Sequence, residues 1–332
     1  MFNNLKKMIK ENKFFIIILL FITFLFNFKL PYFVNIPGGV INIDERVETI
    51  NNIDYLGSLN MTYVRSIDGI IPSLAIALFN SKWDIISKKQ ENGTSTDKEA
   101  KFMDKTNLES SIDYATITAF KYSNKDLTIN DKKIYVTYIF EEAKTNLKVG
   151  DEIKKIDNIE VNSKKELKKY INSKDIGDKI YISVIHNNKE YIRNAEIIEI
   201  DNTKLIGIMF DTDYDIKTYP RVNIKFKDNE SGPSGGLMLA LTIYSKINNI
   251  DITKGYKVSG TGTIDEDGNV GEIGGVKYKL AGAVKNKMDI FLVPNGDNYN
   301  EAIKEKEKNK YNIKIYGVDT FEDAINYLKK LD

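Results

Sequence analysis

The 332-residue sequence contains no cysteine and a single histidine, His186. The absence of cysteine excludes thiol nucleophiles, thiolate zinc sites and disulfide bonds, so the fold is insensitive to the redox state of its compartment. With 48 basic and 47 acidic residues, the net charge of +1 gives no electrostatic reason to expect a nucleic-acid partner. The length and the 42% hydrophobic content predict two or three compact units.

The N-terminal segment combines basic residues with a long apolar run. Residues 14–28 are uncharged, and residues 30–34 extend the run past Lys29. Four basic residues precede it: Lys6, Lys7, Lys10 and Lys13. Because about 20 apolar residues cross a hydrocarbon core of ~30 Å, we expect a transmembrane anchor over residues 14–33. Positive charge favours the cytoplasmic side, which predicts a cytoplasmic segment over residues 1–13 and places the remaining domains outside the cytoplasm.

Two alternatives to this anchor are open from the sequence. A cleaved signal peptide is the main one, but bulky residues follow the apolar run where a small-x-small cleavage site is required. A buried core helix is the other, although the lysines before the run and Pro31 and Pro37 after it fit a membrane entry better. We therefore expect a single-pass protein of the cell membrane.

Residues 34–127 give mixed signals, and we assign no chemistry to them. Residues 57–64 alternate like a strand, residues 70–79 hold a short apolar stretch, and the polar residues 87–96 indicate a loop. Residues 107–122 carry apolar or small side chains at helical spacing, which predicts an amphipathic helix.

Residues 128–202 predict a β-rich domain with one helix. A strand over residues 134–140 is followed by a Gly-Asp-Glu-Ile turn, a short hairpin, a helix over residues 163–171 and two closing strands. This order resembles a PDZ domain. The resemblance implies capture of a peptide C-terminus, which is added as a strand beside a domain edge. The carboxylate-binding loop is then expected near residues 130–133, where the usual glycines are absent.

Residues 203–332 alternate strand and helix, which predicts helices packed on a sheet. Within them, Ser234 follows Gly232-Pro233 and precedes an apolar helical run. A serine hydroxyl is a nucleophile only when a base removes its proton. His186 lies in a predicted hairpin turn and is expected to be an exposed turn residue, so a Ser-His-Asp triad is not favoured. A helix N-cap is the alternative role for Ser234.

Lysine can act as the base when burial lowers its pKa toward neutrality. Lys279 follows Gly274-Gly275, and Val276 and Leu280 offer apolar neighbours on the same helix. A rigid Gly-Pro turn would also place Ser234 at a helix start, where free backbone N–H groups favour an oxyanion.

Taken together, these residues resemble the proteolytic domain of the Lon family, from about Val222 to Val293. The stretch Gly232 to Gly236 matches the nucleophile motif, with Gly235 where alanine is usual. Thr261-Gly262 and the segment from Gly274 to Lys279 match the second motif. The resemblance implies that Ser234 is the nucleophile, that Lys279 is the general base and that Thr261 positions the lysine amine.

Three features qualify the resemblance. The family's lysine is the fourth residue after the paired glycines, which selects Lys279 over Lys277. Many Lon proteins carry an acid three residues before the nucleophile, whereas this chain has Ser231 there with Glu230 adjacent. The familiar Lon proteases contain an ATPase module, and this sequence contains no Gly-x-x-x-x-Gly-Lys-Ser/Thr phosphate loop.

The order of the segments resembles the membrane-anchored PDZ–Lon proteases of bacteria. We therefore expect an α+β multi-domain protein: a transmembrane helix, a membrane-proximal region over 34–127, a PDZ-like β-rich domain over 128–202 and a Lon-type α/β proteolytic domain over 203–332. The expected activity is ATP-independent serine endopeptidase activity on unfolded or membrane-associated proteins, with no metal or cofactor and with a homo-oligomeric ring as the family's assembly. A non-catalytic PDZ scaffold that retains a Lon-like fold is the alternative.

Overall fold

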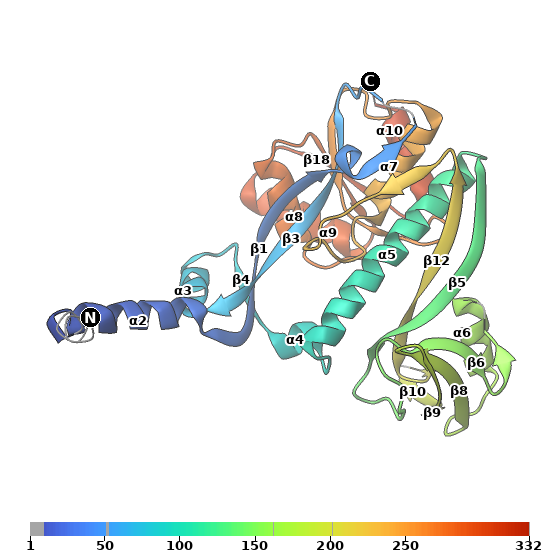
Figure 1. Cartoon of the computed structure of the whole chain (residues 1–332). Helices are drawn as coiled ribbons and strands as arrows, with labels where there is room; N and C mark the ends of the chain where they lie inside the picture. Colours follow the sequence, from blue (N-terminus) through green and yellow to red (C-terminus); the bar gives the residue numbers. More distant parts are fainter. Residues whose placement is uncertain (1–9, 51–52, 162, 201, 332) are drawn as a thin grey trace, which may run out of the picture. The chain divides into compact units, whose positions relative to one another are not determined.

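The computed structural model describes residues 10–50, 53–161, 163–200 and 202–331. It divides into two compact units. The smaller unit comprises Met1–Pro37 and Val64–Gly93, and the larger comprises Gly38–Tyr63 and Thr94–Asp332. Figure 1 labels the elements of both.

The smaller unit begins with the apolar helix α2, Lys13–Asn27, which has 15 residues. At 1.5 Å per residue this length spans about 22 Å, less than the ~30 Å of a hydrocarbon core. The chain then becomes strand β1, Lys29–Asn42, in which Phe33 pairs with Ile86. The other elements of this unit are the part of β3 (Ser58–Ile70) from Val64 onward, α3 (Ile71–Phe79), β4 (Asp84–Ser87) and α4 (Lys88–Asn92).

The expected membrane anchor is wrong, and so is the single-pass localisation derived from it. Across the described residues, the structure contains no helix with the length and apolar character needed to cross a membrane. The physical reason lies in residues 30–34, which were expected to lengthen the apolar run but belong to β1, because Pro31 has no N–H to continue a helix. Most of the expected cytoplasmic segment, residues 1–9, lies outside the described residues.

The larger unit contains a mostly parallel sheet with helices. Strand β14 pairs in parallel with β3 and with β17, and β17 pairs in parallel with β18. The elements of this part are β14 (Lys257–Gly260), β17 (Ile290–Pro294), β18 (Lys314–Val318), α7 (Gly236–Asn248), α8 (Val276–Lys285), α9 (Asp297–Asn309) and α10 (Phe321–Lys329). Helix α7 is almost entirely buried in the core, which agrees with its Leu-Met-Leu-Ala-Leu run.

A second, antiparallel sheet in the larger unit has the order β12-β5-β6-β8-β9. Its elements are β5 (Asp126–Ile139), β6 (Glu152–Ile156), β7 (Ile159–Glu160) beside β6, β8 (Lys179–His186), β9 (Lys189–Glu196), β12 (Ile208–Tyr219) and helix α6 (Lys164–Asn172). Residues 130–133, expected as a carboxylate-binding loop, instead lie inside β5, where residues 131–133 pair with β12. The loop prediction is therefore wrong, because a partner strand lets β5 continue.

Helix α5, Asp97–Tyr122, packs against α7 and β12 within the larger unit (Figure 1). It begins ten residues before the expected helix because Thr96 and Glu99 form a capping box at its N-terminus. The shorter elements are the 3-10 helix Ile43–Arg46, β2 (Val47–Thr49), which pairs with β13 (Val222–Ile224), β10 (Ile198–Ile200), which pairs with β11 (Thr203–Leu205), and β15 (Thr263–Ile264), which pairs with β16 (Val270–Gly271).

Candidate active site

Ser234 lies in a turn, one residue before the N-cap of α7, Gly235. Helix α5 holds this turn from the side. The Ser111 hydroxyl donates to the Pro233 carbonyl over 3.1 Å, and the Gly232 N–H donates to the Asp104 carbonyl over 3.2 Å. The position of Ser234 is therefore set by α5 as well as by the Gly-Pro turn itself.

Two consecutive backbone N–H groups beside Ser234 are available to a ligand. The N–H of Gly236 donates to Pro233, and the N–H of Leu237 donates to Gly262. In contrast, the N–H groups of Ser234 and Gly235 have no hydrogen-bond partner within the described parts of the chain. Free N–H groups at a helix start can bind the oxyanion of an acyl-transfer intermediate.

Thr261 connects Lys279 to the Ser234 turn. The Lys279 Nζ donates to Thr261 Oγ1 over 3.1 Å, and Thr261 Oγ1 donates to the Ser234 carbonyl over 3.0 Å. The Gly262 N–H donates to the same carbonyl over 2.8 Å. The three residues named from the sequence are thus brought together, through the Ser234 carbonyl rather than through its hydroxyl.

Lys279 is a buried amine on α8, with only 4% of its surface exposed. Among the described residues no carboxylate pairs with it. Burial disfavours the ammonium form and lowers the pKa of Lys279 to about 8. At pH 7 about a tenth of this lysine is therefore an uncharged amine that can accept a proton, and the fraction rises with pH.

The neighbours that the sequence left open have other contacts. Glu230 forms a two-contact ion pair with Arg46, at 2.7 and 3.2 Å, although the two residues lie 184 positions apart. Its carboxylate is partly buried, yet Arg46 and the Lys227 N–H hold the pKa of Glu230 below its usual range. Ser231 is exposed, and the Lys277 ammonium lies over the Tyr278 ring.

His186 has a different environment from the exposed turn expected for it. The residue ends β8, its side chain is only 24% exposed, and Nδ1 lies 2.8 Å from Asp151 Oδ1. The fully buried Asp151 also pairs with Arg193 over 3.1 Å. His186 thus belongs to a charged cluster inside the antiparallel sheet and not to the surroundings of Ser234.

The structure gives a reason for Gly235, where the Lon motif has alanine. A Cβ at this position would lie 2.7 Å from the Met61 Sδ, so an alanine would force the Met61 side chain to move. Met61 also lines a small cavity of about 40 Å³ beside Ser234. Leu108, Phe226 and Leu239 contribute apolar surface to the same cavity.

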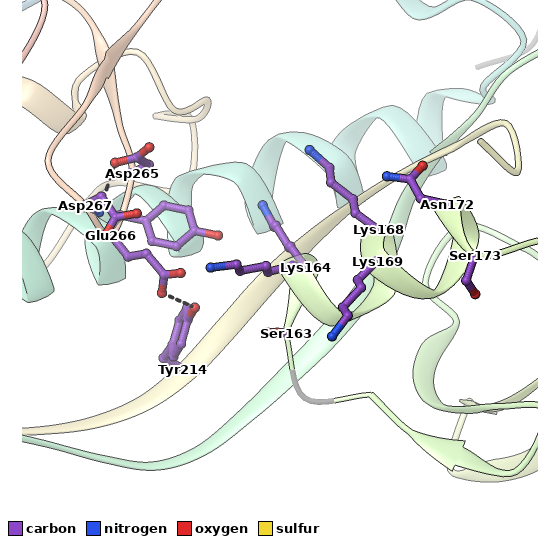
Figure 2. A pocket seen from close by; sticks show the side chains of 12 residues that line it. Ser163, Lys164, Lys168, Lys169, Asn172, Ser173, Tyr214, Asp265, Glu266 and Asp267 are labelled. Carbon is purple, nitrogen blue, oxygen red and sulfur yellow. Dashed lines mark hydrogen bonds between the residues drawn. The ribbon is translucent and has the colours of Figure 1, made fainter. Parts of the chain in front are cut away.

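A larger groove of about 800 Å³ lies elsewhere in the same unit (Figure 2). One wall is α6, with Lys164, Lys168 and Lys169, and the other contains the acidic turn Asp265–Asp267. None of Ser234, Thr261 and Lys279 lines it. Its size therefore does not make it the candidate active site, because Ser234, the buried Lys279 amine and the free N–H groups beside Ser234 are all absent from it.

The sequence did not identify the contribution of α5 to the site. Ser111 and Asp104 hold the turn that contains Ser234 but belong to no motif, and they lie in a region to which the sequence assigned no chemistry. Only the helical spacing over residues 107–122 was visible, and it cannot show which loop a small polar side chain contacts.

Two groups of known proteins resemble this chain. Residues 120–197 match the family model described as a PDZ domain. The Lon protease of Malacoplasma penetrans is 30% identical over 153 residues, which is 45% of this chain and 19% of that protein. The Lon protease of Campylobacter jejuni is 34% identical over 99 residues, which is 30% of this chain and 12% of that protein. The chain thus spans less than a fifth of the length of these relatives.

Two solved PDZ domains are also similar to a part of the chain. The PDZ domain of an SdrC-like protein from Listeria monocytogenes is 30% identical, with 23% of this chain and 85% of that domain covered and a TM-score of 0.22. A counterpart from Listeria innocua is 32% identical, with 24% and 92% covered and a TM-score of 0.22. The family model over residues 120–197 and the partial identity to Lon proteases show that the chain combines a PDZ domain with partial similarity to Lon proteases.

Proposed function

We propose that the chain is a serine endopeptidase in which Ser234 is the nucleophile and Lys279 the general base. The observation that carries the proposal is the buried Lys279 amine, bound to a Thr261 hydroxyl that also bonds the Ser234 carbonyl. Burying an amine without an acid partner costs stability, so its presence beside a nucleophile turn is better explained by catalysis than by packing.

In the proposed reaction, Ser234 Oγ attacks the carbonyl carbon of a peptide bond while Lys279 Nζ takes the hydroxyl proton. The N–H groups of Ser234 and Gly235 bind the resulting oxyanion. The C–N bond then breaks, Lys279 returns its proton to the leaving amine, and an acyl ester remains on Ser234. Water hydrolyses this ester, with Lys279 accepting a proton from the water and returning it to Ser234.

Thr261 is a positioning residue in this proposal. Its hydroxyl accepts from the amine and donates to the Ser234 carbonyl, which fixes the rotamer of Lys279 relative to the nucleophile turn. The chemical steps use only the two side chains, backbone N–H groups and water. We therefore propose cleavage of unfolded protein chains without ATP, with the PDZ domain, a peptide- or protein-binding class, selecting or positioning substrates.

The proposal is tested with a fluorescent fluorophosphonate probe and with fluorescein-labelled casein as an unfolded substrate. The wild type is expected to bind the probe covalently and to cleave casein in the absence of nucleotide. Ser234→Ala and Lys279→Ala are each expected to abolish both signals. The matched controls are Ser231→Ala and Lys277→Ala, which remove a neighbouring hydroxyl and a neighbouring amine and should retain both signals.

The pH dependence gives an independent test. With a pKa of about 8 for Lys279, the neutral fraction rises from about 10% at pH 7 to about 90% at pH 9, so kcat/KM should rise about tenfold over this range. A flat profile between pH 6 and pH 9 contradicts a lysine base. A wild type that neither labels nor cleaves at any of these pH values favours the scaffold function.

A further inference from the structure

The PDZ-like sheet carries an extra strand from its own chain. Five residues of β12, Ile208 to Thr212, pair antiparallel with Ile139 to Ile134 of β5. The opposite side of β5 pairs with β6 through Ile134 and Tyr135. Both edges of β5 are therefore occupied, and the one taken by β12 is supplied by the segment that leads out of the PDZ-like region.

Alternate apolar side chains of this segment pack against the domain core, whereas Met209 between them is exposed. Ile206 is only 1% exposed, and Ile208 and Phe210 pack against the same cluster. That cluster also contains Leu167 and Ile171 of α6. On the polar side, Lys164 of α6 donates to Asp211 Oδ1 over 2.5 Å (Figure 2 shows Lys164 on the groove wall). The segment is thus held by backbone pairing to β5, by apolar contacts in the core that it shares with α6, and by one ion pair to α6.

The side of β12 that faces away from β5 is hydrogen-bonded to side chains of α5. The Ser110 hydroxyl donates to the Thr212 carbonyl over 2.9 Å, and the Tyr214 N–H donates to Asp113 Oδ2 over 2.9 Å. At the far edge of the sheet, β9 bonds the segment 144–146 through Glu196 and Asn194. At both edges of the sheet, β12 and β9, some of the backbone N–H and C=O groups are therefore already hydrogen-bonded within this chain.

PDZ domains bind peptides by adding them as a strand to an exposed sheet edge, with pockets for alternate side chains. The segment Ile206–Thr212 has these features: it is extended, it pairs with a domain strand, and its alternate apolar residues pack against the domain core, with Ile206 buried and Ile208 and Phe210 partly buried. We infer that the PDZ-like domain holds Ile206–Thr212 of its own chain as its peptide ligand. A polypeptide from outside binds at β5 only by displacing this segment. The inference does not rest on the proposed protease activity.

Hydrogen exchange of the full-length chain tests whether the segment is docked in solution. The amides of residues 208–212 should exchange within about tenfold of those in β8, because they open only with the sheet. The turn at Asn187-Asn188 gives the reference for an exposed backbone. Exchange of residues 208–212 at the rate of this turn, while β8 remains protected, overturns the inference.

A charge reversal at Lys164 tests the occupancy of the edge. The Lys164→Glu variant places two carboxylates together at Asp211 and should speed exchange of residues 208–212 by about tenfold. The control is Lys168→Glu on the same helix and groove wall, because Lys168 forms none of the ion pairs or hydrogen bonds found within the described segments. It should leave the exchange unchanged.

A labelled synthetic peptide, Ile-Gly-Ile-Met-Phe-Asn-Thr, reports the binding site directly. It copies residues 206–212 with asparagine in place of Asp211, so its own affinity does not depend on an ion pair with residue 164. It should bind Lys164→Glu at least about tenfold more tightly than the wild type or Lys168→Glu, because only the competing internal segment is weakened. Equal affinity for all three proteins overturns the inference. So does an absence of binding to Lys164→Glu when residues 208–212 of that variant already exchange freely.

Discussion

Replacing Lys279 with methionine should abolish activity and stabilise the fold. Methionine keeps the length and the apolar stem of lysine but needs no solvation for a charge. Burial lowers the pKa of Lys279 from 10.5 to about 8, which corresponds to about 3 kcal/mol against the charged form in the folded state. Loss of the hydrogen bond to Thr261 offsets about 1 kcal/mol of this, so the variant should be more stable by about 2 kcal/mol at pH 7.

The gain in stability of Lys279→Met over the wild type should decrease as pH rises. Between about pH 8 and pH 10.5 the unfolded chain binds a proton at Lys279 that the folded chain has released, so the stability of the wild type rises with pH in this window. The advantage of Lys279→Met is therefore full below pH 8 and shrinks toward pH 10.5. This is the reverse of a lysine stabilised by an ion pair, whose replacement would cost stability at pH 7.

The measurement is urea unfolding followed by circular dichroism at pH 7 and pH 10.5. Fluorescence is unsuitable, because the single tryptophan, Trp83, belongs to the smaller unit and Lys279 to the larger. Lys285→Met is the matched control, since this exposed lysine lies in the last turn of α8 and should lose up to about 0.5 kcal/mol. A Lys279→Met variant that is less stable than the wild type at pH 7 would refute the reasoning.

Three further predictions concern the surroundings of the site. Thr261→Val should lower kcat/KM on the order of 10- to 100-fold through kcat, and Thr261→Ser should restore it, as measured by casein cleavage. Burial raises the Asp113 pKa to about 7, so the stability of the wild type falls as pH rises from about 4 to 7. Asp113→Asn should therefore stabilise the chain by about 2 kcal/mol at pH 8 but little at pH 4, as measured by urea unfolding. Arg46→Met should cost about 2 kcal/mol by leaving Glu230 unpaired, and adding Glu230→Gln should recover most of this loss.

Local signals in the C-terminal part of the sequence were strong enough to predict its elements closely. The sequence pattern of residues 277–286 is that of a helix and that of residues 290–293 is that of a strand, and the structure has α8 at Val276–Lys285 and β17 at Ile290–Pro294. Both follow from short apolar runs bounded by glycine or proline, which act within a few residues. The roles of Ser234, Thr261 and Lys279 came from the family resemblance and stay a proposal.

Helix α5 shows where such reasoning stops. Its buried face contains Ser110, Ser111, Thr116 and Thr118, which an apolar periodicity does not reveal. These side chains are buried because each donates a hydrogen bond to a carbonyl, three of them on distant segments and one, Thr116, within the helix. The ion pair of Arg46 with Glu230 likewise depends on residues far apart in sequence. The membrane anchor predicted from the apolar run at residues 14–28 was wrong for a different reason. Hydropathy counts apolar residues, but a helix crosses a membrane only if the helical backbone continues for the full length.

Adjacent residues of α5 attach strand β12 and the Ser234 turn to one helix turn. The Ser110 hydroxyl donates to the Thr212 carbonyl of β12, and the Ser111 hydroxyl donates to the Pro233 carbonyl beside Ser234. Because packed helices move as rigid elements, displacement of β12 by an incoming peptide would remove a restraint from the same turn that positions Ser234. Under the two proposals, this turn of α5 is the element through which a binding edge and a catalytic site are coupled. Lys279 donates to Thr261, and Thr261 donates to the Ser234 carbonyl, so these two hydrogen bonds do not include α5. Any effect of peptide binding on catalysis should therefore act on the nucleophile turn and leave the pKa of Lys279 unchanged.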